Sequence, residues 1–155
     1  MTRRSNQRPR TLREDAARLV AACPAWNARR AARRIAQDID QALAPTGLGA
    51  AQVGLLAQIA AADDDTLGAL ARRAGLDQST LSRNLRVLET AGLVEIAVVE
   101  RDLRRRAVWL TETGLRRLEA ALPAWRDAQA AVARHLPPDL VRRLAMAADA
   151  LPEGG

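Results

Sequence analysis

The chain has 155 residues, 48% of them hydrophobic, so it is long enough to bury a core and too apolar to be disordered. Its net charge of +6 favours a polyanionic partner such as a nucleic acid, although a GC-rich genome is an alternative source of its 24 basic residues, all of them arginine. One cysteine, one histidine and no apolar run of about 20 residues exclude a disulfide framework, a multi-cysteine zinc site and a membrane span, so we expect a cytoplasmic protein with no metal and no cofactor.

The N-terminal segment, residues 1–10, is basic and contains Pro9, and we expect it to be a disordered arm. Residues 11–22 are predicted to form a helix. A second helix is expected to begin at Pro24, because proline suits the first turn of a helix, and to end near Leu43. One face of this second helix is apolar and carries Ala28, Ala32, Ile35, Ile39 and Leu43.

Three further helices are predicted after a loop at residues 44–47. The first covers residues 50–62, and Asp63–Asp65 is expected to end it and to cap the next helix at 66–74. Gly75 is a stop signal. Asp77 is expected to cap the third helix, residues 78–91, which ends at Gly92.

The pattern then changes from a helical period to alternation. Val94, Ile96 and Val98 alternate with polar or small residues, as do Val108 and Leu110, and Glu100–Leu103 connects the two runs as in a β-hairpin. A long helix is expected at 112–136, with Pro123 kinking or splitting it. A last helix is expected at 139–150.

Three helices followed by a hairpin indicate a winged helix-turn-helix, in a fold that is mainly α-helical with a small β-hairpin wing. The third helix of this motif enters the major groove of DNA. Its leucines share one face and its polar residues the other, and hydroxyls and backbone N–H groups at its start are expected to bind phosphate. An ordinary amphipathic surface helix is the alternative interpretation of residues 78–91 alone. The polar face carries Ser79, Ser82, Arg83 and Arg86, with Gln78 and Thr80 beside it.

The runs Leu76–Arg83 and Leu88–Val94 resemble the recognition helix of the MarR family and the segment that follows it. Asp102-Leu103-Arg104, shortly before Leu110–Gly114, resembles the wing and the next helix start of that family. The resemblance covers about residues 24–150. It implies that Arg104 enters the minor groove, that Asp102 orients it and that Arg105 also contacts DNA. Val99 replaces an aspartate that is frequent in the family, so we expect the wing turn to differ from the family's.

The resemblance also implies a homodimer that reads a pseudo-palindromic operator on double-stranded DNA. Residues 11–49 and 112–151 would then be dimerisation helices, residues 50–111 the DNA-binding lobe and residues 152–155 a tail. The family's signal is a small aromatic acid, and Trp26, Arg29 and Arg30 are candidate residues to bind it, although a core or interface position is the simpler interpretation of Trp26. In some relatives a cysteine senses peroxide, but Cys23 lacks the tyrosine partners of that branch, because the chain has no tyrosine.

No enzyme motif is found: the sequence has no Gly-rich phosphate loop, H-E-x-x-H motif or nucleophile elbow. We therefore expect a transcriptional regulator, a repressor released by a small anionic, aromatic molecule, and not an enzyme. Two alternatives remain open. One is a redox-sensing regulator that uses Cys23, and the other is an architectural protein that binds DNA without sequence preference.

Overall fold

The computed structural model of the chain describes residues 10–63, 65–99 and 102–152, with the backbone alone for residues 10, 99 and 102–105. The chain divides after Gln37 into two units. The first contains helix α1 (Arg10–Ala22) and most of helix α2 (Pro24–Leu43), as predicted. Proline has no N–H to donate, so a break before Pro24 leaves no backbone donor unsatisfied there. The amide Nδ2 of Asn27 spans the break and donates to the Ala21 carbonyl at 2.9 Å.

The second unit contains the remaining elements, and their order is the predicted one. Residues 44–46, predicted as a loop, form a short 3-10 turn. Pro123 lies inside a continuous helix, so of the two predicted outcomes the split does not occur. The elements are α3 (Ala50–Ala60), α4 (Leu67–Ala74), α5 (Gln78–Thr90), β1 (Val94–Val99), β2 (Asp102–Leu110), α6 (Glu112–Ala133) and α7 (Pro138–Asp149).

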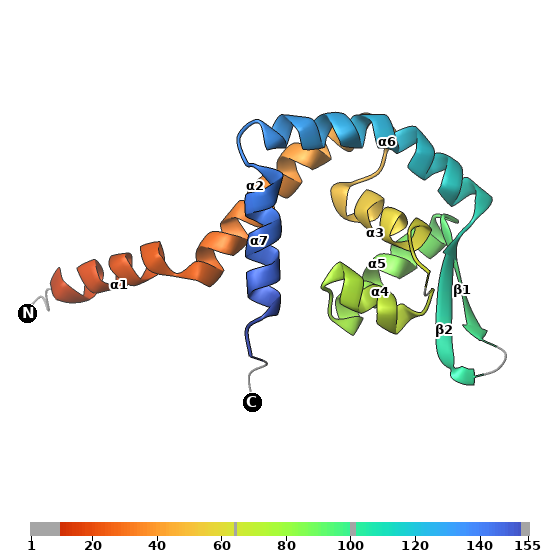
Figure 1. Ribbon diagram of the computed structural model, residues 1–155, viewed down its shortest axis with the longest axis horizontal. Coiled ribbons are helices and arrows are strands. Elements are labelled where there is room, and N and C mark those ends of the chain that lie inside the picture. The colour runs from red at the N-terminus through yellow and green to blue at the C-terminus, as the bar shows by residue number, and fades with distance from the viewer. Residues whose placement is uncertain (1–9, 64, 100–101, 153–155) are drawn as a thin grey trace, which may run out of the picture. The chain divides into compact units, whose positions relative to one another are not determined.

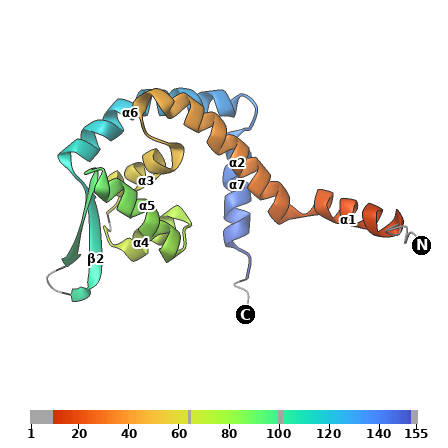
Figure 2. The same ribbon diagram turned by 180° about the vertical axis from the view of Figure 1, so that it is seen from behind.

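The core of this unit lies where α3, α4, α5, the hairpin and α6 meet. Figures 1 and 2 show α4 and α5 beside the hairpin, and α3 packs against α4, β2 and α6. The core is aliphatic, as a chain without phenylalanine or tyrosine requires. Its side chains with less than 2% exposure are Leu43, Val53, Leu56, Leu70, Leu85, Leu88 and Val108.

The hairpin is antiparallel and gains a short third partner from the segment before α4. Val94 pairs with Leu110, and Ala107 also forms an isolated bridge with Thr66. The Val108 N–H donates to the Asp65 carbonyl at 2.9 Å. The predicted capping role of Asp63–Asp65 is therefore wrong, because Asp65 pairs with β2 through its backbone. The N-cap of α4 is Thr66, whose hydroxyl accepts a hydrogen bond from the Ala69 N–H at 3.3 Å.

A tight junction joins the end of α5 to the start of α6. The Thr111 hydroxyl donates to the Gly92 carbonyl at 2.7 Å and accepts from the Gly114 N–H at 2.9 Å. The Thr111 N–H also donates to the Leu93 carbonyl at 3.1 Å. Gly114 packs so closely on Leu93 that a Cβ there would overlap that carbonyl. The junction therefore ties the segment that follows α5 to the first turn of α6.

No single helix in the described parts of the chain is both long enough and apolar enough to span a membrane. The bent pair Pro24–Thr46 and Ala50–Ala60 reaches that length and apolarity only when its two halves are taken together.

Candidate nucleic-acid interface

Helix α5 has one buried face and one exposed face. Leu81, Leu85 and Leu88, spaced to share a side, are each at most 2% exposed. The polar residues of the opposite side are exposed, as the sequence predicts. These exposed residues are Gln78, Ser79, Ser82, Arg83 and Arg86. The buried leucines fix the rotation of the helix, so its polar row is presented outward.

The N-terminus of α5 is organised by the carboxylate of Asp77. Its Oδ1 accepts from the Ser79 hydroxyl at 2.6 Å and from the Thr80 N–H at 2.9 Å, and its Oδ2 accepts from the Thr80 hydroxyl at 2.7 Å. The Ser79 hydroxyl first, then the Thr80 hydroxyl and N–H, favour the charged carboxylate and hold the pKa of Asp77 well below its usual range. Asp77 therefore remains an anion that caps α5 at neutral pH.

This network changes the expectation that these hydroxyls bind phosphate. Both hydroxyls donate their hydrogen bonds to Asp77, so the oxygens of Ser79 and Thr80 can act only as acceptors toward DNA. Arg83 folds back over the same turn, with Nε donating to the Ser79 carbonyl at 3.4 Å and Nη2 to the Thr80 hydroxyl at 3.5 Å. These long contacts hold Arg83 near the helix start and are weak enough to be exchanged for a guanine edge.

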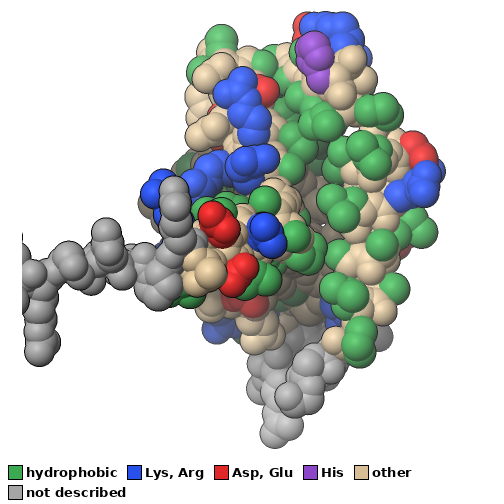
Figure 3. Space-filling view, turned by 90° about the vertical axis from the view of Figure 1, so that its left-hand side faces the viewer, with side chains coloured by type: hydrophobic (Ala, Val, Ile, Leu, Met, Phe, Trp, Pro, Cys, Tyr) green, Lys and Arg blue, Asp and Glu red, His purple; other side chains and the backbone are tan. Residues whose placement is uncertain are grey.

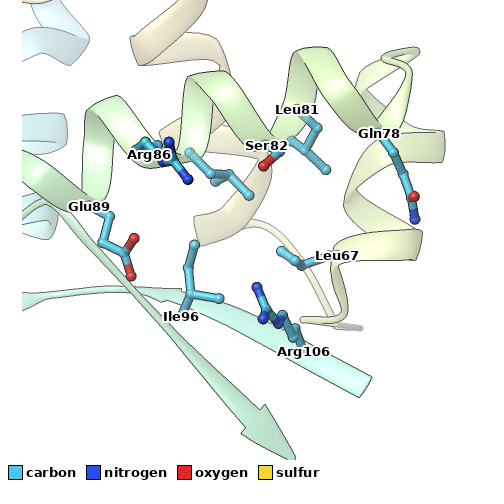
Figure 4. A pocket seen from close by; sticks show the side chains of 9 residues that line it. Leu67, Gln78, Leu81, Ser82, Arg86, Glu89, Ile96 and Arg106 are labelled. Atoms are coloured by element: carbon cyan, nitrogen blue, oxygen red, sulfur yellow. The ribbon is translucent and has the colours of Figure 1, made fainter. Parts of the chain in front are cut away.

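A cleft of about 280 Å³ lies between α5 and the hairpin. Its apolar side chains include Leu67, Leu81, Leu85 and Ile96. Figure 4 shows polar side chains from both elements directed toward the space between them, Arg106 from the strand and Gln78, Ser82, Arg86 and Glu89 from the helix. Three residues predicted to bind DNA, Gln78, Ser82 and Arg86, are thus brought together here.

The wing residues Asp102, Arg104 and Arg105 belong to β2, but their side chains lie outside the described residues. The register of the hairpin shifts between Val98 and Val99, so that Val99 pairs with Asp102. The ladder is therefore irregular at Val99, the position where this chain departs from the family.

The prediction from sequence missed Arg106. The signal was present, because Leu110, Val108 and Arg106 alternate along β2 and alternate residues share a face of a strand. An arginine that continues an inward-facing apolar row indicates a charged group at the edge of the core.

The residues predicted to sense a ligand belong to the first unit. Trp26, Arg29 and Arg30, joined by Arg33, line a surface hollow of about 300 Å³ on α2. Trp26 is 58% exposed, so it is not a core residue of this unit, and the exposure fits a ligand site and an interface position alike. Cys23 is a half-buried free thiol between α1 and α2 and is not among the residues that line the hollow.

A protein-family model described as MarR family matches residues 46–105. No curated protein sequence matches the chain. The transcriptional regulator MosR of M. tuberculosis in complex with DNA is 38% identical, with a TM-score of 0.75 and coverage of 83% of this chain and 97% of that chain. A second structure of M. tuberculosis MosR is 36% identical, with a TM-score of 0.72 and coverage of 85% and 99%.

A mutant MarR of E. coli complexed with operator DNA shares the fold at 24% identity, with a TM-score of 0.71 and coverage of 86% of this chain and 98% of that chain. The family match lies on the helices and strands that carry the α5 interface, and the similarity to MosR extends over almost all of that protein. The chain therefore belongs to the MarR family of winged-helix transcriptional regulators.

Proposed function

We propose that this protein is a homodimeric repressor that binds a pseudo-palindromic operator inside the cell and leaves it when a small anionic, aromatic molecule binds. The observation that carries the proposal is the outward polar row of α5, set over buried leucines and capped by Asp77. A helix of this kind fits the major groove, where arginine can donate two hydrogen bonds to guanine. MosR, a relative at 38% identity, was crystallised with DNA.

In this proposal α5 supplies base contacts and the hairpin supplies Arg104 to the adjoining minor groove, oriented by Asp102. Arg105 adds a contact to the backbone. A narrow minor groove has an enhanced negative potential, which attracts arginine. The proposal assigns residues 50–111 to DNA and the helices on either side, 11–49 and 112–151, to the dimer.

Apolar side chains on the terminal helices support a dimer. Hydrophobic side chains are common on the face shown in Figure 3. On α7, Leu140, Leu144 and Met146 are each more than half exposed. An apolar helix face that is exposed to water in one chain indicates that another protein surface covers it. A two-fold dimer covers it with the same face of a second copy.

The DNA-binding part of the proposal is tested with Arg83→Ala. DNA fragments that wild-type protein selects from genomic DNA provide the operator, and affinity is measured by fluorescence anisotropy. Removal of a bidentate base contact is expected to cost about 1–3 kcal/mol at the operator and to relax the preference at that base pair. Arg126→Ala, which removes an exposed arginine from α6, is the control and is expected to leave the preference intact. Equal operator affinity of the two variants would remove Arg83 from base recognition. A wild-type protein that binds every duplex equally would be architectural.

The hollow on α2 supports the choice of effector. One aromatic ring and three guanidinium groups border a volume at the lower end of the range of small-molecule sites. An aromatic face stacks on a ring, and the cations attract a carboxylate.

The effector is tested with benzoate as the probe and with Cys23→Ser as the control for a redox switch. Benzoate is expected to release wild-type protein and Cys23→Ser from the operator alike, and Trp26→Ala is expected to need more of it. If mild peroxide releases the wild type but not Cys23→Ser, and benzoate releases neither, the redox alternative is correct.

A further inference from the structure

Arg106 occupies an unusual place on the hairpin. It pairs with Val98 across the strands, and the neighbouring pair on the same face is Val108 with Ile96. Val108 is 2% exposed, whereas Val98 is 44% exposed. The inward face of the hairpin therefore leaves the core at Arg106, and this side chain reaches the cleft beside α5 instead of packing in the core.

The cleft brings two arginines from different elements to one space. Arg86 comes from α5 and Arg106 from β2, and neither forms an ion pair with another described residue. Ser82 and Gln78 add hydrogen-bond donors on the helix side. Glu89 enters from the other end of the cleft in Figure 4, so an anion is best placed toward Gln78, Ser82 and Arg106.

The geometry points to a phosphate clamp: Arg106, with Gln78 and Ser82, holds a phosphate of the DNA strand that crosses from the major to the minor groove, and Arg86 adds to the positive charge of the cleft. The inference rests on the proposed placement of α5 in the major groove and of the hairpin end in the adjoining minor groove. Neighbouring grooves of a duplex are separated by one sugar–phosphate strand. The cleft lies between the two elements and faces that strand.

A phosphate of bound DNA suits this site better than a free anion. Ser82, Arg86 and Arg106 are exposed, so their attraction for a small ion in solution is screened by salt. A phosphate in a duplex that α5 already holds arrives at high effective concentration and loses little further freedom. Such a contact carries no sequence information and instead fixes the depth and orientation of the helix in the groove.

The test is the salt dependence of binding by the full chain, measured by fluorescence anisotropy between about 50 and 200 mM salt on the selected operator and on an unrelated duplex. Arg106→Ala is expected to reduce the slope of log affinity against log salt by about 0.9 for each phosphate that a protomer no longer neutralises. It is expected to weaken binding to both duplexes by the same factor. Arg106→Lys keeps the charge and is expected to restore the slope, and Arg126→Ala is expected to leave it unchanged.

Two results would overturn the clamp. One is a slope for Arg106→Ala equal to that of Arg126→Ala. The other is a loss of affinity confined to the operator, which would make Arg106 a base contact. In the first case, if benzoate also no longer releases Arg106→Ala from the operator, the cleft binds a free anion instead of DNA.

Arg83→Ala on the same two duplexes separates this inference from the proposed function. If Arg83→Ala loses the operator preference while Arg106→Ala keeps the wild-type slope, the proposed function is supported and the phosphate clamp is wrong. If wild-type protein shows no preference for the operator but the slope still depends on Arg106, the phosphate clamp is supported and sequence-specific regulation is wrong.

Discussion

At the scale of single residues, Asp77 organises the start of α5, the helix that the proposed function places on DNA. Its carboxylate accepts hydrogen bonds from the Thr80 N–H at the start of the helix and from the hydroxyls of Ser79 and Thr80. A carboxylate so close to the interface repels phosphate, yet it orients the oxygens of Ser79 and Thr80 as acceptors. Acceptors on a recognition helix favour the exocyclic amino groups of adenine and cytosine.

Asp77→Asn is expected to lower the melting temperature, because the amide offers one acceptor oxygen where the carboxylate offers two. The effect depends on pH with a defined sign. An unfolded aspartate has a pKa of about 3.9, and hydrogen bonds from Ser79 and Thr80 lower the folded pKa. The stabilisation by Asp77 is therefore complete above the unfolded pKa and is lost as the pH falls toward the folded pKa.

Thermal melts followed by circular dichroism check this expectation. The difference in melting temperature between wild type and Asp77→Asn should be constant from about pH 7 to about pH 5 and shrink below about pH 4. Asp127→Asn, which removes an exposed carboxylate from α6, is the matched control. A difference that grows on acidification would contradict the cap.

The sequence predicted the role of a residue where that role depends on its neighbours along the chain. The capping role of Asp77 follows from its place before a helical pattern, and the exposed row of α5 follows from the spacing of its leucines. The capping role predicted for Asp63–Asp65 was wrong because Asp65 instead pairs with β2, which is distant along the chain. Spacing along one helix contains no information about such a partner.

At the scale of elements, the junction between α5 and α6 sets the position of α5. Thr111 ties the start of α6 to Gly92 and Leu93, and Gly114 lets the helix approach the chain there. The Leu110–Gly114 motif, which in the sequence carries only a family resemblance, thus has a packing function. Its glycine is required by a close contact and not by an unusual backbone angle.

Gly114→Ala is expected to destabilise the fold by about 1–3 kcal/mol, because the new Cβ overlaps the backbone of Leu93, which cannot move away like a flexible side chain. Gly54→Ala is the control, since Gly54 lies inside α3 and a Cβ added there would meet nothing within 4 Å. That change is expected to stabilise by about 0.5–1 kcal/mol through helix propensity alone. Urea unfolding measures both variants. Equal effects would show that the contact at Leu93 relaxes without cost.

At the scale of the whole molecule, the main question is how the terminal helices are covered. The leucines of α7 are apolar, yet they remain exposed within the described part of the chain. A second copy of the chain would cover them and would also place two α5 helices on one duplex, as the proposed operator symmetry requires.

We expect wild-type protein to sediment as a dimer and the double variant Leu140→Glu with Leu144→Glu to sediment as a monomer, because carboxylates at an apolar interface would lose their hydration. Circular dichroism should show unchanged helix content. Linking two sites raises affinity by about 10²–10⁴-fold, so the monomer is expected to bind the operator at least about 100-fold more weakly. Asp149→Asn on the same helix is the control. A dimeric double variant would place the interface elsewhere.

The sequence by itself determined the order of the elements, the recognition face of α5 and the family resemblance. Each depends on periodicity and capping within a few turns, where neighbours in the sequence are neighbours in space. Only the tertiary structure decided the cleft beside Arg106, the pairing of Asp65 with β2 and the contact of Gly114 with Leu93. These join residues that are distant along the chain, and their geometry depends on how the helices and the hairpin pack on a shared core.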